Sequence, residues 1–214
     1  MSKTVLIVIS LIVIVGCKQS SKTALPYYNE ASFSPLFLTK DLANKKITHH
    51  VAHFSFLDQD GNIFNSDQLQ GKIHVTNFFF TGCGSICPGM MSKLSSVQQQ
   101  FKEKDIYFLS FSVTPWSDSV SRLSDYARTH QIDGNHWKLL TGKTSDIYQI
   151  ARQSYFAEEA LGFNKDSSNF LHTEHVLLVD DMKRIRGIYN GTLQLDMEQL
   201  SKDIRILLQE LKED

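Results

Sequence analysis

The stretch Phe78-Phe79-Phe80-Thr81-Gly82-Cys83-Gly84-Ser85-Ile86-Cys87-Pro88 decides the fold of this chain. The apolar run from Ile73 to Phe80 predicts a buried strand, because nearly continuous hydrophobic residues suit the centre of a parallel or mixed sheet. A loop with Gly and two thiols follows, and a helical pattern begins just beyond Pro88. The stretch therefore predicts a strand, a loop that carries both cysteines, and a helix.

The spacing of Cys83 and Cys87 brings both thiols to the start of that helix. Proline suits the first helical position and disfavours the α conformation in the residue before it, so we expect Cys87 at the helix cap. Unpaired N–H groups and the positive end of the helix dipole favour a thiolate there for both sulfurs. The spacing allows a structural disulfide, a catalytic dithiol or a site for one soft metal ion. Copper(I) is the first-row ion that two thiolates suit best.

The composition predicts one domain of ordinary size with an appendage. The chain has 214 residues, and its 42% apolar content is enough for a single buried core. Its 22 basic residues are balanced by 23 acidic ones, and no basic tract stands out. We therefore expect no nucleic-acid partner.

The appendage is at the start of the chain. Lys3 and the apolar run from Val5 to Val15 resemble the first two regions of a secretory signal peptide, and the run is too short to span a membrane comfortably. It ends in Ile14-Val15-Gly16-Cys17, which resembles the lipobox of bacterial lipoproteins. We predict a lipoprotein signal peptide over residues 1–17 and lipidation of Cys17, with an uncleaved short anchor as the alternative. The domain would then lie in the bacterial cell envelope, on the periplasmic side of a membrane.

The rest of the chain divides into a tether and a domain. Residues 18–47 are predicted to be a tether with docking segments around Tyr27-Tyr28 and from Phe33 to Phe37, because such aromatic residues are unusual in a solvated linker. Residues 48–214 are predicted to be a thioredoxin-like α/β domain, with a central mixed sheet flanked by helices and an added N-terminal β-hairpin. The strands are expected at about 51–57, from 63, and at 73–80, 106–113, 137–140, 176–179 and 185–189.

A third donor often completes a copper site with two thiolates, and imidazole is the usual candidate. The chain has eight histidines. His172 and His175 precede the strand that is expected from Val176. In a thioredoxin-like arrangement this entry lies beside the dithiol loop, so either histidine could face the thiols.

From about Phe54 to Thr192 the chain resembles the Sco/SenC family, which are thioredoxin-like copper chaperones that serve cytochrome c oxidase assembly. The matching motifs are Phe56-Leu57-Asp58-Gln59-Asp60-Gly61, Leu69-Gln70-Gly71-Lys72, Asn77 to Cys83, Ile86-Cys87-Pro88, Ser112-Val113-Thr114-Pro115 with Asp118, Trp137 to Gly142, His172-Thr173 eight residues before Asp180, Gly187, and Asn190-Gly191. The chain has Thr114 and Leu171 where the family commonly has acidic residues, which removes negative charge near the site.

The resemblance implies one copper ion, Cu(I) or Cu(II), bound by Cys83, Cys87 and His172, with His175 as the second candidate. It implies a monomer whose partner is the CuA site of cytochrome c oxidase subunit II or another exported cuproprotein. The first hypothesis is therefore a membrane-tethered copper metallochaperone. The second is a thiol-disulfide oxidoreductase with Cys83 and Cys87 as its catalytic pair, and the third is a lipoprotein in which these cysteines only form a structural disulfide.

Overall fold

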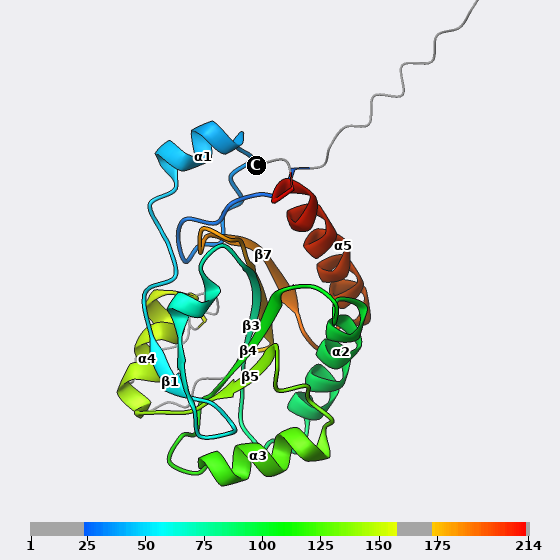
Figure 1. Ribbon diagram of the computed structural model, residues 1–214. Coiled ribbons are helices and arrows are strands. Elements are labelled where there is room, and N and C mark those ends of the chain that lie inside the picture. Colours follow the sequence, from blue (N-terminus) through cyan, green and yellow to red (C-terminus); the bar gives the residue numbers. More distant parts are fainter. Residues whose placement is uncertain (1–23, 158–172, 213–214) are drawn as a thin grey trace, which may run out of the picture.

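A five-stranded mixed sheet forms the centre of the computed structural model, which describes residues 24–157 and 173–212 (Figure 1). The strand order is β5-β4-β3-β6-β7. The first three strands in this order are parallel to one another, the fourth runs antiparallel to the third, and the fifth runs antiparallel to the fourth. The strands are β3 (Ile73–Phe79), β4 (Ile106–Ser112), β5 (Trp137–Leu140), β6 (His175–Val179) and β7 (Ile185–Asn190). This arrangement confirms the thioredoxin-like α/β fold that the sequence predicts.

Strand β3 is the central element, as its composition predicts. It pairs with β4 on one side and with β6 on the other, and all seven of its residues are buried. A strand with both edges paired and both faces covered has no polar side, which is why its sequence does not alternate.

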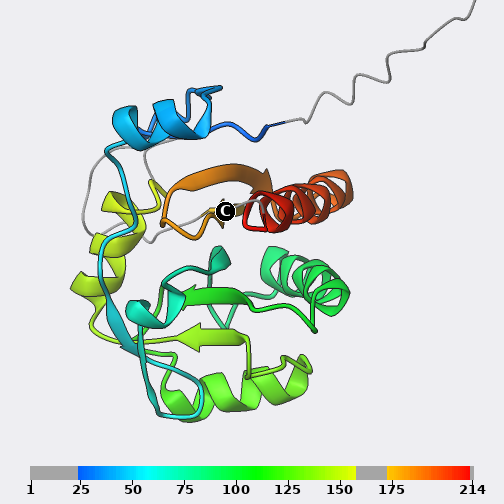
Figure 2. The ribbon, with the colours of Figure 1, turned by 45° about the horizontal axis from the view of Figure 1, so that its top comes forward.

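Helices cover both faces of the sheet (Figure 2). One face packs against α2 (Ile86–Gln100), α3 (Val120–Thr129) and α5 (Gln194–Glu210), and its apolar cluster includes Leu94, Leu123 and Ile204. The other face packs against α4 (Thr144–Gln153) and the predicted hairpin of β1 (Ser55–Leu57) and β2 (Ile63–Asn65). A short helix, η1 (Ser66–Leu69), leads from β2 towards β3.

Residues 24–47 pack against the domain. They include a helix that the sequence analysis did not predict, α1 (Lys40–Lys46). Tyr27 is buried, and the Arg186 guanidinium lies 4.0 Å from the centre of its ring. Arg186 also donates hydrogen bonds of 3.1 Å to the backbone carbonyls of Leu25 and Pro26. The described residues of the predicted tether are therefore held against the domain, and Tyr27 is one of the residues that make this contact.

The start of α2 differs from the prediction. Ser85 is the N-cap and Ile86 is the first helical residue, so Cys87 lies inside the first turn and not at the cap. The prediction was wrong because proline is tolerated throughout the first turn, where backbone N–H groups have no partner within the helix. Pro88 therefore does not have to be the first residue of the helix.

Candidate functional site

Cys83 and Cys87 lie just beyond the carboxyl end of β3, in the loop and in the first turn of α2. Both are free thiols, and both are buried in the apolar cluster beneath α2, α3 and α5. The N–H of Cys83 donates to the Phe80 carbonyl at 3.2 Å, which fixes the turn out of the strand. The predicted strand, loop and helix thus bring the two thiols to one place.

The two thiols have different acidities. Burial raises the pKa of Cys83, but hydrogen bonds from the Cys87 thiol, from the Cys87 N–H at 3.4 Å and from Ser85 outweigh it and lower the pKa to about 7. Burial is also the largest effect at Cys87, where the hydrogen bond to Cys83 adds to it and the pKa rises to about 12. The prediction that the helix start favours a thiolate holds for Cys83 and is wrong for Cys87. The Cys87 sulfur is more deeply buried than that of Cys83, and its S–H donates the hydrogen bond between the two sulfurs.

This difference in pKa predicts how the reactivity of each thiol changes with pH. The reactive form is the thiolate, so a lowered pKa brings reactivity to lower pH. We expect alkylation of Cys83 by iodoacetamide to rise through a midpoint near pH 7, and Cys87 to stay nearly unreactive throughout the same range. An ordinary thiol of pKa ~8.5 would be only about 3% thiolate at pH 7. The measurement is peptide mass spectrometry of the reduced chain from Lys18 onward, alkylated anaerobically between pH 5 and 9. Equal rates at both cysteines, or a Cys83 midpoint near 9, would contradict the assignment.

Asp118 fixes the loop that carries Cys83. This carboxylate is fully buried and accepts hydrogen bonds from the N–H and the hydroxyl of Thr81. It also accepts from the hydroxyls of Ser112, at 2.6 Å, and Thr114, at 3.0 Å. One carboxylate therefore joins the beginning of the dithiol loop to the end of β4. Thr114, where the sequence analysis noted only that the acidic residue common in the family is missing, therefore donates one of the hydrogen bonds that hold Asp118 in place.

Tyr126 of α3 is a neighbour of the site that the sequence analysis did not single out. The centre of its ring lies 5.4 Å from that of Phe79 and 4.1 Å from that of His130. Its hydroxyl is buried and has no hydrogen-bond partner among the described residues. Burial, followed by the negative charge at Cys87 and Cys83, raises the pKa of this hydroxyl, so it stays protonated. Nothing in the sequence alone marks this position.

The structure places only one of the two candidate histidines. His172 lies outside the described residues. His175 is the first residue of β6, and its ring meets that of Phe33 edge-on at 6.0 Å. Side chains alternate along a strand, and Val176 belongs to the cluster that contains the cysteines whereas Leu177 belongs to the opposite one. His175 is therefore on the face of the sheet away from the thiols.

Within residues 24–157 and 173–212, no three His, Cys, Asp or Glu side chains come together in a way that could hold a metal ion. His175 thus does not complete the dithiol in this part of the chain. Cys17, the predicted lipidation site, also lies outside the described residues. None of the described helices is both long enough and apolar enough to cross a membrane.

The fold and the paired thiols define a thioredoxin-like protein with a C-x-x-x-C dithiol at the start of a helix. Residues 43–209 match the SCO1/SenC family model, and the chain belongs to this family. The resemblance that the sequence motifs indicate is thereby confirmed.

Individual relatives agree with this assignment. The SCO1 protein homolog of Bacillus subtilis (strain 168) is 27% identical over 162 residues, which cover 74% of this chain and 83% of that protein. The crystal structure of a SCO1/SenC family lipoprotein from Bacillus anthracis str. Ames has a TM-score of 0.66 and 28% identity, and the match covers 76% of this chain and 96% of that one. BsSco, a member of the Sco family of cytochrome c oxidase assembly proteins with a disulfide switch, has a TM-score of 0.63 and 27% identity over 73% of this chain and 92% of its own.

Proposed function

We propose that this protein is a copper metallochaperone, held at a membrane by a lipid on Cys17. It binds one copper ion through Cys83, Cys87 and His172 and delivers it to the CuA site of cytochrome c oxidase subunit II. The domain lies in the bacterial cell envelope, on the periplasmic side. The observation that carries the proposal is the pair of free, buried thiols at the start of α2, one of which has a pKa of about 7.

The chemistry of the donors supports copper as the cargo. Thiolates are soft ligands that favour Cu(I), and in the described part of the chain no carboxylate joins the two thiols in a group that could hold a harder ion. Ligand thiols must lose their protons when metal binds, and the Cys83 thiol is already half ionised near neutral pH. Arabidopsis thaliana ScoI, which shares this fold, has been crystallised with copper bound.

The topology supports His172 as the third ligand. Strand β6 runs antiparallel to β3, and Val176 near its start pairs with Asn77 near the end of β3. The chain therefore enters β6 at the same edge of the sheet at which it leaves β3 towards the thiols. Thr173 is buried there, and its hydroxyl accepts a hydrogen bond from the N–H of His175. His172 directly precedes this anchored residue in the sequence.

A lipid on Cys17 is supported by the sequence motif and by the lipoprotein relative from Bacillus anthracis. The partner is supported by family membership, because BsSco belongs to a family of cytochrome c oxidase assembly proteins. The lipid would keep the domain close to a partner in the same membrane.

The second candidate function is thiol-disulfide exchange with the same partner, and the different acidities of the thiols favour it. The Cys83 thiolate would attack a disulfide of the partner, form a mixed disulfide and release one partner thiolate. Cys87, after losing its proton, would then attack the Cys83 sulfur and release the second partner thiol. The two electrons come from the dithiol, which ends as the Cys83–Cys87 disulfide.

One experiment separates the two functions. The copper(I)-loaded chain from Lys18 onward is mixed anaerobically with a reduced, copper-free CuA domain, and the copper-free reduced chain is mixed with the same domain in its disulfide form. The proposal expects copper to appear on the partner in the first mixture, with the thiol content of both proteins unchanged. If copper does not bind to the chain, or binds and is not transferred, and the partner is reduced in the second mixture, the metallochaperone proposal is rejected. The oxidoreductase is then the function that the experiment supports.

A further inference from the structure

Helix α1 and the residues before it expose an apolar surface. Leu36, Phe37 and Leu42 are 39%, 73% and 43% exposed. The buried residues of the same segment, Ala43 and Ile47, pack inward with Tyr27 in a small cluster of their own. Single exposed apolar residues are ordinary on a protein surface, but three within seven positions need an explanation. We define Leu36, Phe37 and Leu42, with Lys45 and Lys46, as the α1 surface.

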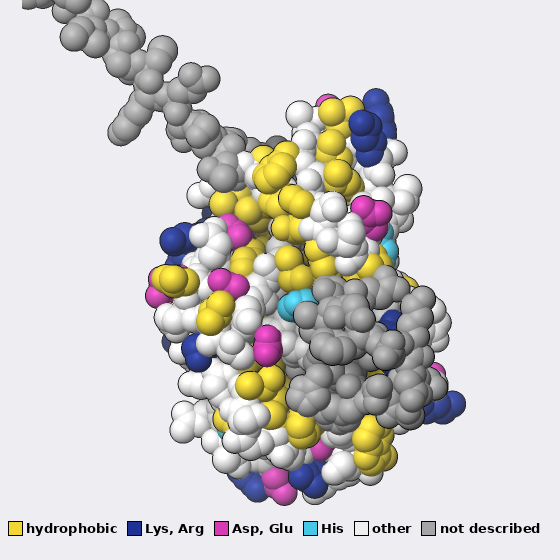
Figure 3. Space-filling view, turned by 180° about the vertical axis from the view of Figure 1, so that it is seen from behind, with side chains coloured by type: hydrophobic (Ala, Val, Ile, Leu, Met, Phe, Trp, Pro, Cys, Tyr) yellow, Lys and Arg dark blue, Asp and Glu magenta, His cyan; other side chains and the backbone are white. Residues whose placement is uncertain are grey.

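Helix α1 itself carries a net positive charge. The sequence of α1 carries Lys40, Lys45 and Lys46 against a single Asp41, and Lys45 and Lys46 are exposed in its last turn. Figure 3 shows hydrophobic and basic side chains together at the upper end of the molecule, over α1. Exposed apolar residues beside lysines are the combination that binds an anionic lipid surface.

The position of the segment also indicates a lipid bilayer. Leu25 is held to the domain by Arg186, and it lies eight residues after Cys17. Because an extended chain spans at most ~3.6 Å per residue, a lipid on Cys17 would keep Leu25 within about 30 Å of the bilayer. Lys18 and Lys22 lie within this connection and add positive charge. A surface tethered so closely meets the bilayer at a high effective concentration.

From these observations we propose that the α1 surface docks on the anionic lipid surface of the membrane that carries the lipid anchor. The inference rests on the proposed lipidation of Cys17.

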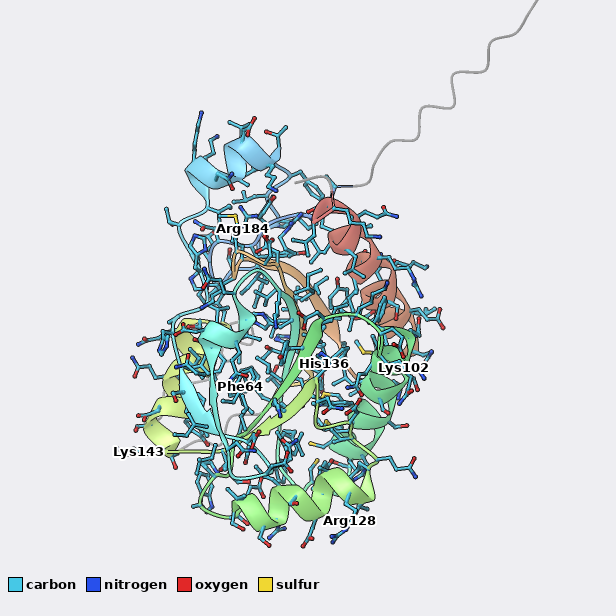
Figure 4. The ribbon with its side chains drawn as sticks, in the orientation of Figure 1. Phe64, Lys102, Arg128, His136, Lys143 and Arg184 are labelled. Atoms are coloured by element: carbon cyan, nitrogen blue, oxygen red, sulfur yellow. The ribbon has the colours of Figure 1, made fainter. Side chains whose placement is uncertain are left out.

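Docking would orient the dithiol. Asn44 of α1 accepts a hydrogen bond of 2.8 Å from Arg184, which lies below α1 at the β6–β7 turn (Figure 4). This turn is at the opposite end of the sheet from the thiols, because Val179 at the end of β6 pairs with His74 at the start of β3. A domain that rests on its α1 surface therefore presents the dithiol away from the bilayer, towards the aqueous domain of a membrane-bound partner.

The test uses the full lipidated chain in vesicles of phosphatidylglycerol or phosphatidylcholine that contain brominated lipids, which quench indole fluorescence on contact. The probe is Phe37→Trp, and the matched control is Ile63→Trp, because Ile63 is 70% exposed but belongs to the hairpin. We expect quenching at position 37 to be at least about twofold greater than at position 63 in phosphatidylglycerol. We expect Lys45→Glu with Lys46→Glu to remove most of that difference.

Flotation of the vesicles separates failure of the docking from failure of the anchor. A chain that floats with the vesicles but shows equal quenching at both positions overturns the docking and leaves the lipid anchor intact. A chain that does not float overturns both. A blue shift at position 37 that appears without vesicles and grows with protein concentration would assign the α1 surface to a second copy of the chain, and would also overturn the proposal.

Discussion

Replacing both Cys83 and Cys87 with Ser is expected to reduce copper(I) binding from one ion per chain to none. A serine hydroxyl does not ionise near neutral pH, so it offers no soft anionic donor. Each single replacement leaves one thiolate, and we expect it to lower the affinity by more than about 100-fold, since even loss of a residue that only supports a ligand costs about 10–100-fold.

The measurement is an anaerobic titration of the chain from Lys18 onward against a coloured copper(I) chelator. The matched control is Ser96→Ala, on an exposed position of the same helix, which should leave one copper per chain. Both cysteines are buried, so thermal unfolding must first show that the variants are folded. An unchanged copper stoichiometry in the folded double variant would reject the dithiol as the metal site.

Replacing Asp118 with Ala is expected to lower the free energy of unfolding by about 3 kcal/mol or more. The change leaves the N–H and hydroxyl of Thr81 and the hydroxyls of Ser112 and Thr114 without their acceptor. Each buried donor left without a partner costs about 1–3 kcal/mol, although such costs do not add fully in one network. Asp118→Asn retains one acceptor oxygen and should cost less than Asp118→Ala.

Denaturant unfolding of the reduced, copper-free chain measures this effect. Asp125→Ala is the control, because Asp125 is an exposed aspartate of α3 whose pair with Arg128 lies at the surface. Exposed pairs contribute about 0–1 kcal/mol. Equal losses for Asp118→Ala and Asp125→Ala would mean that the hydrogen bonds to Asp118 do not hold the dithiol loop in the way the structure indicates.

Most strands could be predicted because buried strands consist mainly of apolar residues, and such runs are visible in the sequence. The continuous apolar run of β3 and the short runs of β6 and β7 around Asp180 are found close to their predicted bounds. Helix α1 could not be predicted, because its seven residues contain only Leu42 and Ala43 as apolar side chains and show no helical period. Its packing depends on residues distant in the sequence, such as Arg184.

The candidate site could be predicted in part. The sequence indicates that the two thiols meet at a helix start, since this depends on local spacing alone. It does not indicate which thiol is the more acidic, because that depends on the depth of Cys87 and on the hydrogen bond between the sulfurs. The residue type alone also does not decide between His172 and His175, because both are histidines. The position of His175 beside Phe33 depends on the register of β6 in the sheet.

The central claim is that the imidazole of His172 joins the two sulfurs around one copper ion. Copper K-edge X-ray absorption of the Cu(II)-loaded chain tests it most directly, because an imidazole ligand leaves a characteristic scattering pattern beyond the first shell. We predict that pattern in the unchanged chain and in His175→Ala, together with copper–sulfur scattering, and its loss in His172→Ala. An imidazole pattern that persists in His172→Ala, or that disappears in His175→Ala, would contradict the claim.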